Sequence, residues 1–427
     1  VTNYMGADAT VYDEIDPAIT SAFVGYDKLT NESEITVLTT EEEVVDALSE
    51  GDKGTVIVDE TVFYATMGGQ EGDKGYISTP DGEFRVDTTI KLKGGKVGHV
   101  GTITKGMIKV GDVVTLSVDP EYRADTCKNH SATHILQKAL RTVLGNHVEQ
   151  KGSYVDPERL RFDFTHFQSV TADELKKVED IVNEQIANAI PVETKIMSIE
   201  EAKKTGAMAL FGEKYGENVR VVCMGDFSKE FCGGTHVANT ANIRLFKIVS
   251  ESGVAAGVRR IEAVTGRGVL NALNHVSDMV KQGAAILKVN NINDFVDVCE
   301  HIANDIKEKE HSINKLNNSI AAFKLDSLFA NSELKKDVRI ISAAFTSTNS
   351  EMLKNMCDRV LSSADKCVAV LFGIDGEKAT IAVACGKEAV KKGAHAGKIV
   401  KEVAAIVGGK GGGKPERAMA GVKDLTK

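Results

Sequence analysis

The chain has 427 residues, of which 42% are hydrophobic and 26% charged, as expected for a globular protein of two to four domains. No apolar run approaches the roughly 18 residues of a membrane-spanning helix, which argues against a membrane protein. The 7 cysteines are an odd number without close pairs. This pattern argues against a disulfide framework and favours a reducing, cytoplasmic environment.

The net charge of −9 is unevenly distributed. Residues 1–60 hold 15 acidic and 2 basic side chains, whereas residues 387–427 hold 4 acidic and 10 basic ones. Salt screens charges that are more than about 10 Å apart, so a polyanion responds to local charge rather than to the total. The acidic total therefore does not exclude RNA binding at the C-terminal end.

Four regions with different periodicities predict a multidomain α+β protein. Residues 1–118 hold short β-branched runs between glycine- and aspartate-rich turns, which is typical of a small β-barrel. Residues 119–266 mix helices and strands in an α+β core, residues 267–335 are polar and helical, and residues 336–427 form a separate α/β unit. Because the chain begins with Val1 rather than Met, we interpret it as part of a longer protein.

The α+β core is expected to begin with a helix that runs from Glu121 to Gly145. Thr171 begins a capping box for a second helix, which ends near residue 189. The other expected elements are strands near 152–155, 160–164, 219–224 and 243–250, a further strand after Pro191, and a glycine-rich loop at 232–236.

The helical region contains a heptad pattern. Its two sets of positions are Cys299, Ile306, Ile313 and Ile320, and, three residues beyond each of these, Ile302, Lys309, Leu316 and Phe323. Such a seam is typical of a coiled coil. Because it covers only about three and a half heptads, a helical hairpin fits the pattern as well as a long coil does.

The C-terminal unit is expected to hold strands at 338–343, 367–372 and 379–383, and helices from 350 and at 396–407, followed by a glycine-rich stretch and a short tail. The stretch nearly matches a P-loop, but Pro415 stands where Ser or Thr would bind magnesium. It also follows a helix rather than a strand. Nucleotide hydrolysis is therefore not expected, and the basic charge favours phosphate contacts.

Two pairs of potential metal ligands have the same spacing. His130 and His134 stand four residues apart on the first predicted helix, and therefore on one face of it. Cys232 and His236 are also four residues apart, on the glycine-rich loop. Three imidazoles and one thiolate suit tetrahedral zinc. Either pair alone is more often a surface or core feature, but the two together predict a Zn²⁺ site.

Six motifs follow one another along the chain: His130-Ser-Ala-Thr-His134, His147-Val-Glu-Gln-Lys-Gly-Ser153, Leu160-Arg-Phe-Asp-Phe-Thr-His166, Gly206–Tyr215, Cys232-Gly-Gly-Thr-His236 and Gly257-Val-Arg-Arg-Ile-Glu-Ala263. In this order they resemble the editing domain of alanyl-tRNA synthetase. Gly68-Gly-Gln70 and the glycine-rich stretch at 408–415 are also similar to that enzyme. The family's aminoacylation domain, which uses ATP and alanine, is expected upstream of Val1.

The resemblance implies hydrolysis of tRNA(Ala) that wrongly carries serine or glycine. Binding alone discriminates against one added hydroxyl or one missing methyl by only about 1–3 kcal/mol, so a second, hydrolytic site is the physical remedy. Zinc can lower the pKa of a water or polarise a carbonyl. Because four protein ligands close its shell, orientation of the terminal adenosine and the α-amino group, or weak Lewis-acid assistance, is favoured over hydroxide attack.

Five residues besides the zinc ligands are candidates for the editing pocket. Gln150, which the resemblance places facing the pocket, is expected to position the water or the ester; alternatively it stabilises a turn. Thr133 is expected to bond the serine hydroxyl, or else the backbone of its own helix. Arg161 resembles an arginine near the family's pocket and is expected to pair with a phosphate or with Asp163, or else to be a solvated strand residue. Gly233 and Gly234 allow backbone N–H groups to approach the ligand.

Other cysteines and histidines are not expected to bind the zinc, because its shell is already full. Cys127 and Cys223 are expected to be buried thiols. His147 and His166 are not expected to be ligands, and only His166 is expected near the pocket.

In the C-terminal unit, Lys410, Lys414 and Arg417 are the expected RNA contacts. The resemblance implies that this unit grips the elbow of tRNA(Ala) and that the C-terminal region can form a homodimer. Two alternatives remain: a tRNA-binding module with a structural zinc, and a free-standing deacylase of the AlaX type. The long helical region and the glycine-rich C-terminal unit argue against the second.

Overall fold

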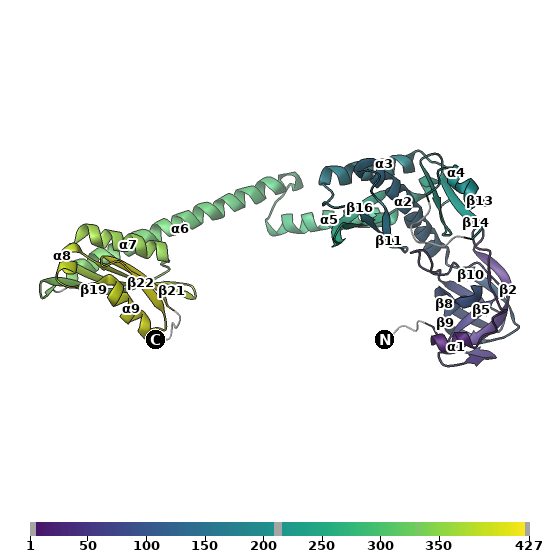
Figure 1. Ribbon diagram of the computed structural model, residues 1–427, viewed down its shortest axis with the longest axis horizontal. Helices are drawn as coiled ribbons and strands as arrows, with labels where there is room; N and C mark the ends of the chain where they lie inside the picture. Colours follow the sequence, from purple (N-terminus) through teal and green to yellow (C-terminus); the bar gives the residue numbers. More distant parts are fainter. Residues whose placement is uncertain (1–5, 209–215, 333, 423–427) are drawn as a thin grey trace. The chain divides into compact units, whose positions relative to one another are not determined.

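The computed structural model describes residues 6–208, 216–332 and 334–422 (Figure 1). The chain divides into two compact units, Val1–Val280 and Lys281–Lys427. The first unit holds the β-barrel and the α+β core, and the second holds most of the helical region and the C-terminal sheet. The multidomain α+β class predicted from the sequence is confirmed.

Six strands close the barrel, because β10 pairs with both β7 and β2. In the order of the ring they are β10 (Val113–Val118), β7 (Gly75–Ser78), β8 (Gly82–Lys91), β9 (Val97–Lys109), β5 (Lys53–Val58) and β2 (Thr30–Thr39). Shorter elements border the ring: α1 (Ala9–Asp13), β1 (Ala22–Phe23), β3 (Val44–Val45), β4 (Ala47–Ser49), β6 (Glu60–Thr61) and the 3-10 turn η1 (Lys93–Gly95). Alternate side chains point inwards, and those of Ile35, Phe84 and Leu116 are fully buried.

The α+β core is built around α2 (Pro120–Leu144). Asp119 caps its first turn by accepting hydrogen bonds from the backbone N–H groups of Glu121 and Tyr122. The helix ends at Gly145, as predicted, where φ is 117°. The second helix, α3 (Ala172–Ala187), begins with the predicted capping box of Thr171. Both helices share a hydrophobic core with a four-stranded antiparallel sheet.

That sheet has the strand order β11 (Gln150–Val155), β12 (Leu160–Thr165), β17 (Val258–Thr265) and β16 (Phe246–Ala255). A separate three-stranded sheet consists of β13 (Val192–Ser198), β14 (Asn218–Met224) and β15 (Ser228–Phe231). The short elements α4 (Ile199–Lys204) and η2 (Thr240–Ile243) complete the core. Strands β15 and β17 were not expected from the sequence. Residues 209–215 of the Gly206–Tyr215 motif lie outside the described residues.

The helical region consists of α5 (Arg267–Ile286), the turn η3 (Ile292–Asp294) and the long α6 (Phe295–Asn331). The heptad positions all lie on α6. Ile306, Ile313 and Ile320 are 52%, 56% and 64% exposed, so within one chain the predicted seam is not covered by a second helix.

The C-terminal sheet has the order β18 (Leu334–Lys335), β19 (Val338–Thr346), β20 (Cys367–Asp375), β21 (Lys378–Cys385), β23 (Arg417–Val422) and β22 (Lys410–Gly413). The helices of this unit are α7 (Ser350–Ser363), α8 (Lys387–Lys391) and α9 (Ala396–Ile406). Where the sequence analysis expected a glycine-rich stretch and a short tail, β22 and β23 form a β-hairpin. A Cβ on Gly411 would lie 2.2 Å from that of Ala420, so glycine is what lets β22 pair so closely with β23.

Candidate metal site and adjoining cavity

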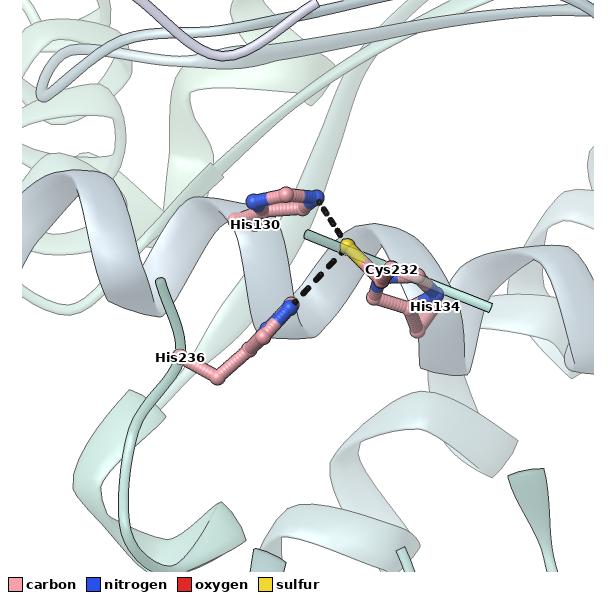
Figure 2. A group of neighbouring side chains, drawn as sticks. All are labelled: His130, His134, Cys232 and His236. Carbon is pink, nitrogen blue, oxygen red and sulfur yellow. Dashed lines mark hydrogen bonds between the residues drawn. The ribbon is translucent and has the colours of Figure 1, made fainter. Parts of the chain in front are cut away.

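The four predicted ligands meet at one point. His130 and His134 project from successive turns of α2, and Cys232 and His236 come from the loop that follows β15 (Figure 2). Their ligand atoms all lie within 4.8 Å of one another. The sulfur of Cys232 lies 3.5 Å from Nε2 of His130 and 3.3 Å from Nε2 of His236. Residues more than 90 positions apart are thus brought to metal-binding separation.

Each imidazole uses its other nitrogen to hold a neighbouring group. Nδ1 of His130 lies 2.7 Å from Oε1 of Gln70, and Nδ1 of His236 lies 3.0 Å from the hydroxyl of Ser131. Nδ1 of His134 bonds to the buried carboxylate of Glu230. If each Nδ1 carries the proton and donates it, the Nε2 lone pairs all point to the common centre.

The chemistry of the donors fits a divalent cation. Nε2 of His134 is buried and has no hydrogen-bond partner among the described residues, which is a costly state that a metal ion relieves. The Cys232 thiolate and the Glu230 carboxylate together carry two negative charges, which a dication balances. Three imidazole nitrogens and one sulfur form the tetrahedral donor set that zinc favours.

Electrostatics favour the thiolate form of the sulfur. Burial raises the pKa of the Cys232 thiol, but the imidazoles of His130, His236 and His134 outweigh it and hold this pKa well below its usual range. Burial, assisted by His130, lowers the pKa of His236 to about 3. The pKa of His134 is instead raised to about 10. Burial alone would lower this pKa, but the negative charges of Glu230 and Cys232 outweigh the effect of burial. The cluster therefore attracts positive charge, either as a proton on His134 or as a metal ion.

Two side chains, those of Arg220 and Tyr26, hold the loop that carries Cys232. Nη1 of Arg220 donates to the carbonyl oxygens of Cys232 and Gly234, both at 2.9 Å. The Tyr26 hydroxyl donates to the carbonyl oxygen of Gly233 at 2.7 Å. A Cβ on Gly234 would lie 2.1 Å from Cε1 of His130, so only glycine fits at this position. A Cβ on Gly233 would approach only the methyl group of Met67, at an ordinary contact distance of 3.5 Å.

The barrel contacts α2 and β11 through a buried ion pair and several hydrogen bonds. Arg123, in the second turn of α2, forms a buried ion pair with Asp73 of the barrel. The same guanidinium donates to the carbonyl oxygens of Gly25 and Val62, both at 2.7 Å. Gly69 accepts a hydrogen bond of 2.7 Å from the N–H of Val155 on β11. These contacts set the position of Gln70 against His130.

A cavity of about 370 Å³ opens beside the ligands. It is lined by four of the five predicted pocket residues, Thr133, Gln150, Gly233 and Gly234, together with the candidate ligands His130, His134 and Cys232. The structure also places Gln137 there, which sequence reasoning missed, although it follows Thr133 by four residues on the same helix face. Gln137 is 7% exposed, and its side chain has no hydrogen bond within the described part of the chain.

Two predicted pocket residues have informative surroundings. The Thr133 hydroxyl donates to the carbonyl oxygen of Asn129 at 2.8 Å, in its own helix, which leaves its oxygen free to accept from a ligand. The Gln150 side chain is half-buried and makes no hydrogen bond to any described residue. Its amide is therefore available to a water or an ester.

Arg161 is not among the residues that line the cavity. Its guanidinium lies over the ring of Tyr154, 5.7 Å from the centroid, and its Nε is 3.9 Å from Asp163. The carboxylate of Asp163 is instead held by two hydrogen bonds from Arg260. The expected carboxylate neighbour is thus present, but the structure does not bring Arg161 to the pocket.

The cysteines and histidines that were not expected to bind zinc do not belong to the metal cluster. Cys127 is buried, and its thiol donates to the Thr235 hydroxyl at 3.2 Å. His147 and His166 contact each other, with Nε2 and Nδ1 2.8 Å apart. None of the three belongs to the four-residue metal group found among the described residues.

The three predicted RNA contacts lie on the terminal hairpin of the second unit. Lys410 begins β22, and Lys414 is exposed in the turn that follows it. Arg417 begins β23 and pairs with Asp358 of α7, with the atoms 2.5 Å apart. The described residues include no helix long and apolar enough to cross a membrane.

Three family models match the chain. Residues 2–122 match tRNA synthetases class II (A), residues 219–262 match the threonyl and alanyl tRNA synthetase second additional domain, and residues 337–427 match the DHHA1 domain. A solved structure, the C-Ala domain of Aquifex aeolicus alanyl-tRNA synthetase, is 25% identical over 23% of this chain and 86% of that chain, with a TM-score of 0.21.

Curated relatives match almost the whole chain. Alanine--tRNA ligase 1 of Lachnoclostridium phytofermentans is 52% identical over 99% of this chain and 48% of its own length. Alanine--tRNA ligase of Acetivibrio thermocellus is 43% identical over 98% of this chain and 47% of its own length. The chain thus spans about half the length of the curated relatives it matches, and it belongs to the alanyl-tRNA synthetase family.

Proposed function

We propose that this chain hydrolyses the ester bond of tRNA(Ala) that wrongly carries serine or glycine, in the cavity beside a zinc ion. The observation that carries the proposal is the convergence of three imidazoles and one thiolate on one centre, next to a cavity with free amide groups. The Threonyl and Alanyl tRNA synthetase second additional domain covers residues 219–262, which include two of the four ligands.

Residues of the chain account for most of what the ester needs. When bound, zinc supplies Lewis acidity and a fixed point of attachment for the substrate's polar groups. Because four protein ligands fill its shell, we assign placement of the water or the carbonyl to the Gln150 amide. Gly233 and Gly234 also line this cavity, and we assign contacts with the ligand to their backbone N–H groups. The Thr133 oxygen is assigned to the serine hydroxyl.

The C-terminal unit is proposed to hold the rest of the tRNA. Lys410 and Lys414 are exposed on the basic terminal hairpin and suit phosphate contacts, whereas Arg417 must exchange its partner Asp358 for RNA. The exposed seam of α6 is the surface we assign to a homodimer. The names of the relatives are those of alanine--tRNA ligases, and we propose the same ligation, with ATP and alanine, for the longer protein.

A turnover assay tests the proposal. The chain is expected to release serine from seryl-tRNA(Ala) and to spare alanyl-tRNA(Ala). Gln150→Ala should slow release of serine at least tenfold, whereas Gln168→Ala, which removes an exposed glutamine, should not. Equal rates of hydrolysis of the two aminoacyl-tRNAs, or no hydrolysis of either, would contradict the proposal.

A second candidate is a tRNA-binding module whose zinc is structural. It is favoured by the closed four-ligand shell, which is typical of structural zinc. This alternative predicts tRNA binding without turnover, and no effect of Gln150→Ala.

A further inference from the structure

A second, smaller cavity of about 200 Å³ lies in the barrel next to the proposed ester cavity. Tyr64, Met67 and Gly233 line both cavities, so the two adjoin. We call the smaller one the barrel cavity. None of the residues assigned so far to the ester or to the metal lies in it, except Gly233 at the junction.

One wall of the barrel cavity is aromatic. The rings of Phe23 and Tyr26 meet edge to face with centroids 4.8 Å apart, and Phe23 meets Tyr64 in the same way at 5.7 Å. Tyr26 is held in place, since its hydroxyl donates to Gly233 and the Arg220 guanidinium lies 4.0 Å from its ring centroid. Rigid aromatic side chains beside a cavity are what nucleobases stack on.

Two lysines supply positive charge to the same cavity. Lys96 is only 5% exposed, yet its ammonium makes a single long hydrogen bond, 3.5 Å from the carbonyl oxygen of Lys93. Lys91 lies at the junction, where its ammonium is 3.4 Å from the sulfur of Met67. Neither lysine pairs with a carboxylate in the described ranges.

A buried ammonium without a counter-charge is costly, and an anionic ligand removes that cost. Residues 1–60 carry 15 acidic side chains, but none of the described residues that line the barrel cavity is acidic. The cavity is therefore a local positive site in an acidic region. It suits a ligand that has both an aromatic ring and a phosphate.

We propose that the barrel cavity binds the terminal adenylate of the aminoacylated tRNA. Its base packs on the aromatic wall of Phe23 and Tyr26, and its 5′-phosphate contacts Lys91 and Lys96. The inference rests on the proposed function, because the ester on the ribose of this adenylate then extends past the residues that the two cavities share and into the larger cavity. The barrel thus reads the 3′ end of the RNA, while α2 and its loop handle the amino acid.

The test measures binding, so that it does not depend on turnover. The probe is a non-hydrolysable seryl amide, 3′-deoxy-3′-(L-serylamino)adenosine, prepared with and without a 5′-phosphate and titrated into the full zinc-loaded chain by calorimetry. Charge-assisted contacts of this kind are expected to tighten binding of the phosphorylated probe about tenfold or more. Adenosine 5′-phosphate alone should bind more weakly than the phosphorylated seryl probe.

Variants assign the contacts. Lys91→Ala and Lys96→Met should each reduce the preference for the phosphorylated probe, and Phe23→Leu should weaken both probes equally. Lys93→Ala is the matched control, because this neighbouring lysine is 88% exposed and pairs with Asp13 instead. If Lys96→Met unfolds on its own, as judged by circular dichroism, the exposed Lys91 still decides the question.

The outcomes separate this inference from the proposed function. No gain from the 5′-phosphate in the unsubstituted chain, or a gain that survives both lysine substitutions, overturns the adenylate site. Equal binding of adenosine 5′-phosphate and the seryl probe contradicts occupation of both cavities by one ligand. A chain that shows the phosphate preference but no hydrolysis of seryl-tRNA(Ala) retains the adenylate site and loses the editing activity.

Discussion

The side-chain oxygen of Gln70, which belongs to the barrel, lies 2.7 Å from Nδ1 of His130 on α2. Gln70 is fully buried, and its amide nitrogen donates to the Thr235 hydroxyl on the ligand loop at 2.8 Å. The same oxygen accepts from the N–H of Thr235 at 3.0 Å. One glutamine thus connects the barrel, the metal helix and the ligand loop, and it fixes which nitrogen of His130 faces the centre.

Substitution of Gln70 is expected to weaken zinc binding without removing a ligand. Partners of metal-bound imidazoles are typically worth about 10–100-fold in metal affinity, so Gln70→Ala should raise the zinc dissociation constant by that factor. Competition with a chromophoric chelator measures it. Gln168→Ala is the control for loss of an exposed glutamine. An unchanged zinc affinity in Gln70→Ala would show that the contact has no role in holding the metal.

The ligands were predictable from the sequence because local geometry sets their spacing. Two histidines four residues apart must share a helix face, and Cys232 and His236 repeat that interval. Their supporting partners were not predictable in this way, because Gln70 is 60 residues from His130 and Glu230 is 96 from His134. Such partners depend on how separate elements pack, which no local pattern records.

The terminal hairpin could not be predicted from the sequence for a different reason. The glycine run at 408–413 has the composition of a loop, since glycine lowers strand propensity. In the structure its Lys410–Gly413 part is the edge strand β22. Strand β23 lies so close to it that a Cβ on Gly413 would be 2.5 Å from Cα of Ala418, which only glycine allows. The expected helices were found because their caps and periodicities are local signals, as at Thr171.

The Thr133 hydroxyl is expected to act in specificity rather than in hydrolysis itself. Thr133→Val keeps the shape of the side chain and removes the oxygen that would accept from serine. One lost hydrogen bond of about 1 kcal/mol should lower kcat/KM roughly fivefold for seryl-tRNA(Ala). The rate for glycyl-tRNA(Ala), which has no side-chain hydroxyl, should not change. Equal losses on both substrates would assign Thr133 to the helix alone, through its bond to Asn129.

The ion pair of Asp73 and Arg123 should matter for stability far more than exposed pairs do. Burial raises the pKa of Asp73, although Arg123 opposes this shift, and the two side chains are 0% and 6% exposed. Asp73→Ala leaves the buried guanidinium without its counter-charge, which typically costs about 3–5 kcal/mol. Urea denaturation of the full chain measures the loss.

The matched control for Asp73→Ala is Asp87→Ala, which removes the partner of Arg85 in an ion pair that is about half exposed. Exposed pairs contribute at most about 1 kcal/mol, so this variant should unfold almost as the unsubstituted chain does. Similar losses in the two variants would contradict the anchoring role of the buried pair.

His99 should make the barrel sensitive to acid. It is fully buried, with Nδ1 2.8 Å from the carbonyl oxygen of Val56 and Nε2 2.7 Å from the Thr61 hydroxyl, and burial lowers its pKa to about 4. In the unfolded chain a histidine has a pKa near 6.5. Between these values the unfolded state binds more protons, so the stability contributed by neutral His99 is present above about pH 6.5 and is lost as the pH falls towards 4.

The size of this effect follows from the pKa difference, at about 1.4 kcal/mol per unit, which amounts to at most about 3.5 kcal/mol across the window. Amide hydrogen exchange in β5 and β9 reports the barrel separately from the other parts of the chain. His99→Gln retains a donor for Val56 and an acceptor for Thr61 but does not titrate, so its barrel should lose less stability between pH 6.5 and 4. Parallel pH profiles for the two proteins would mean that other groups govern the acid response, because only the difference between the profiles isolates His99.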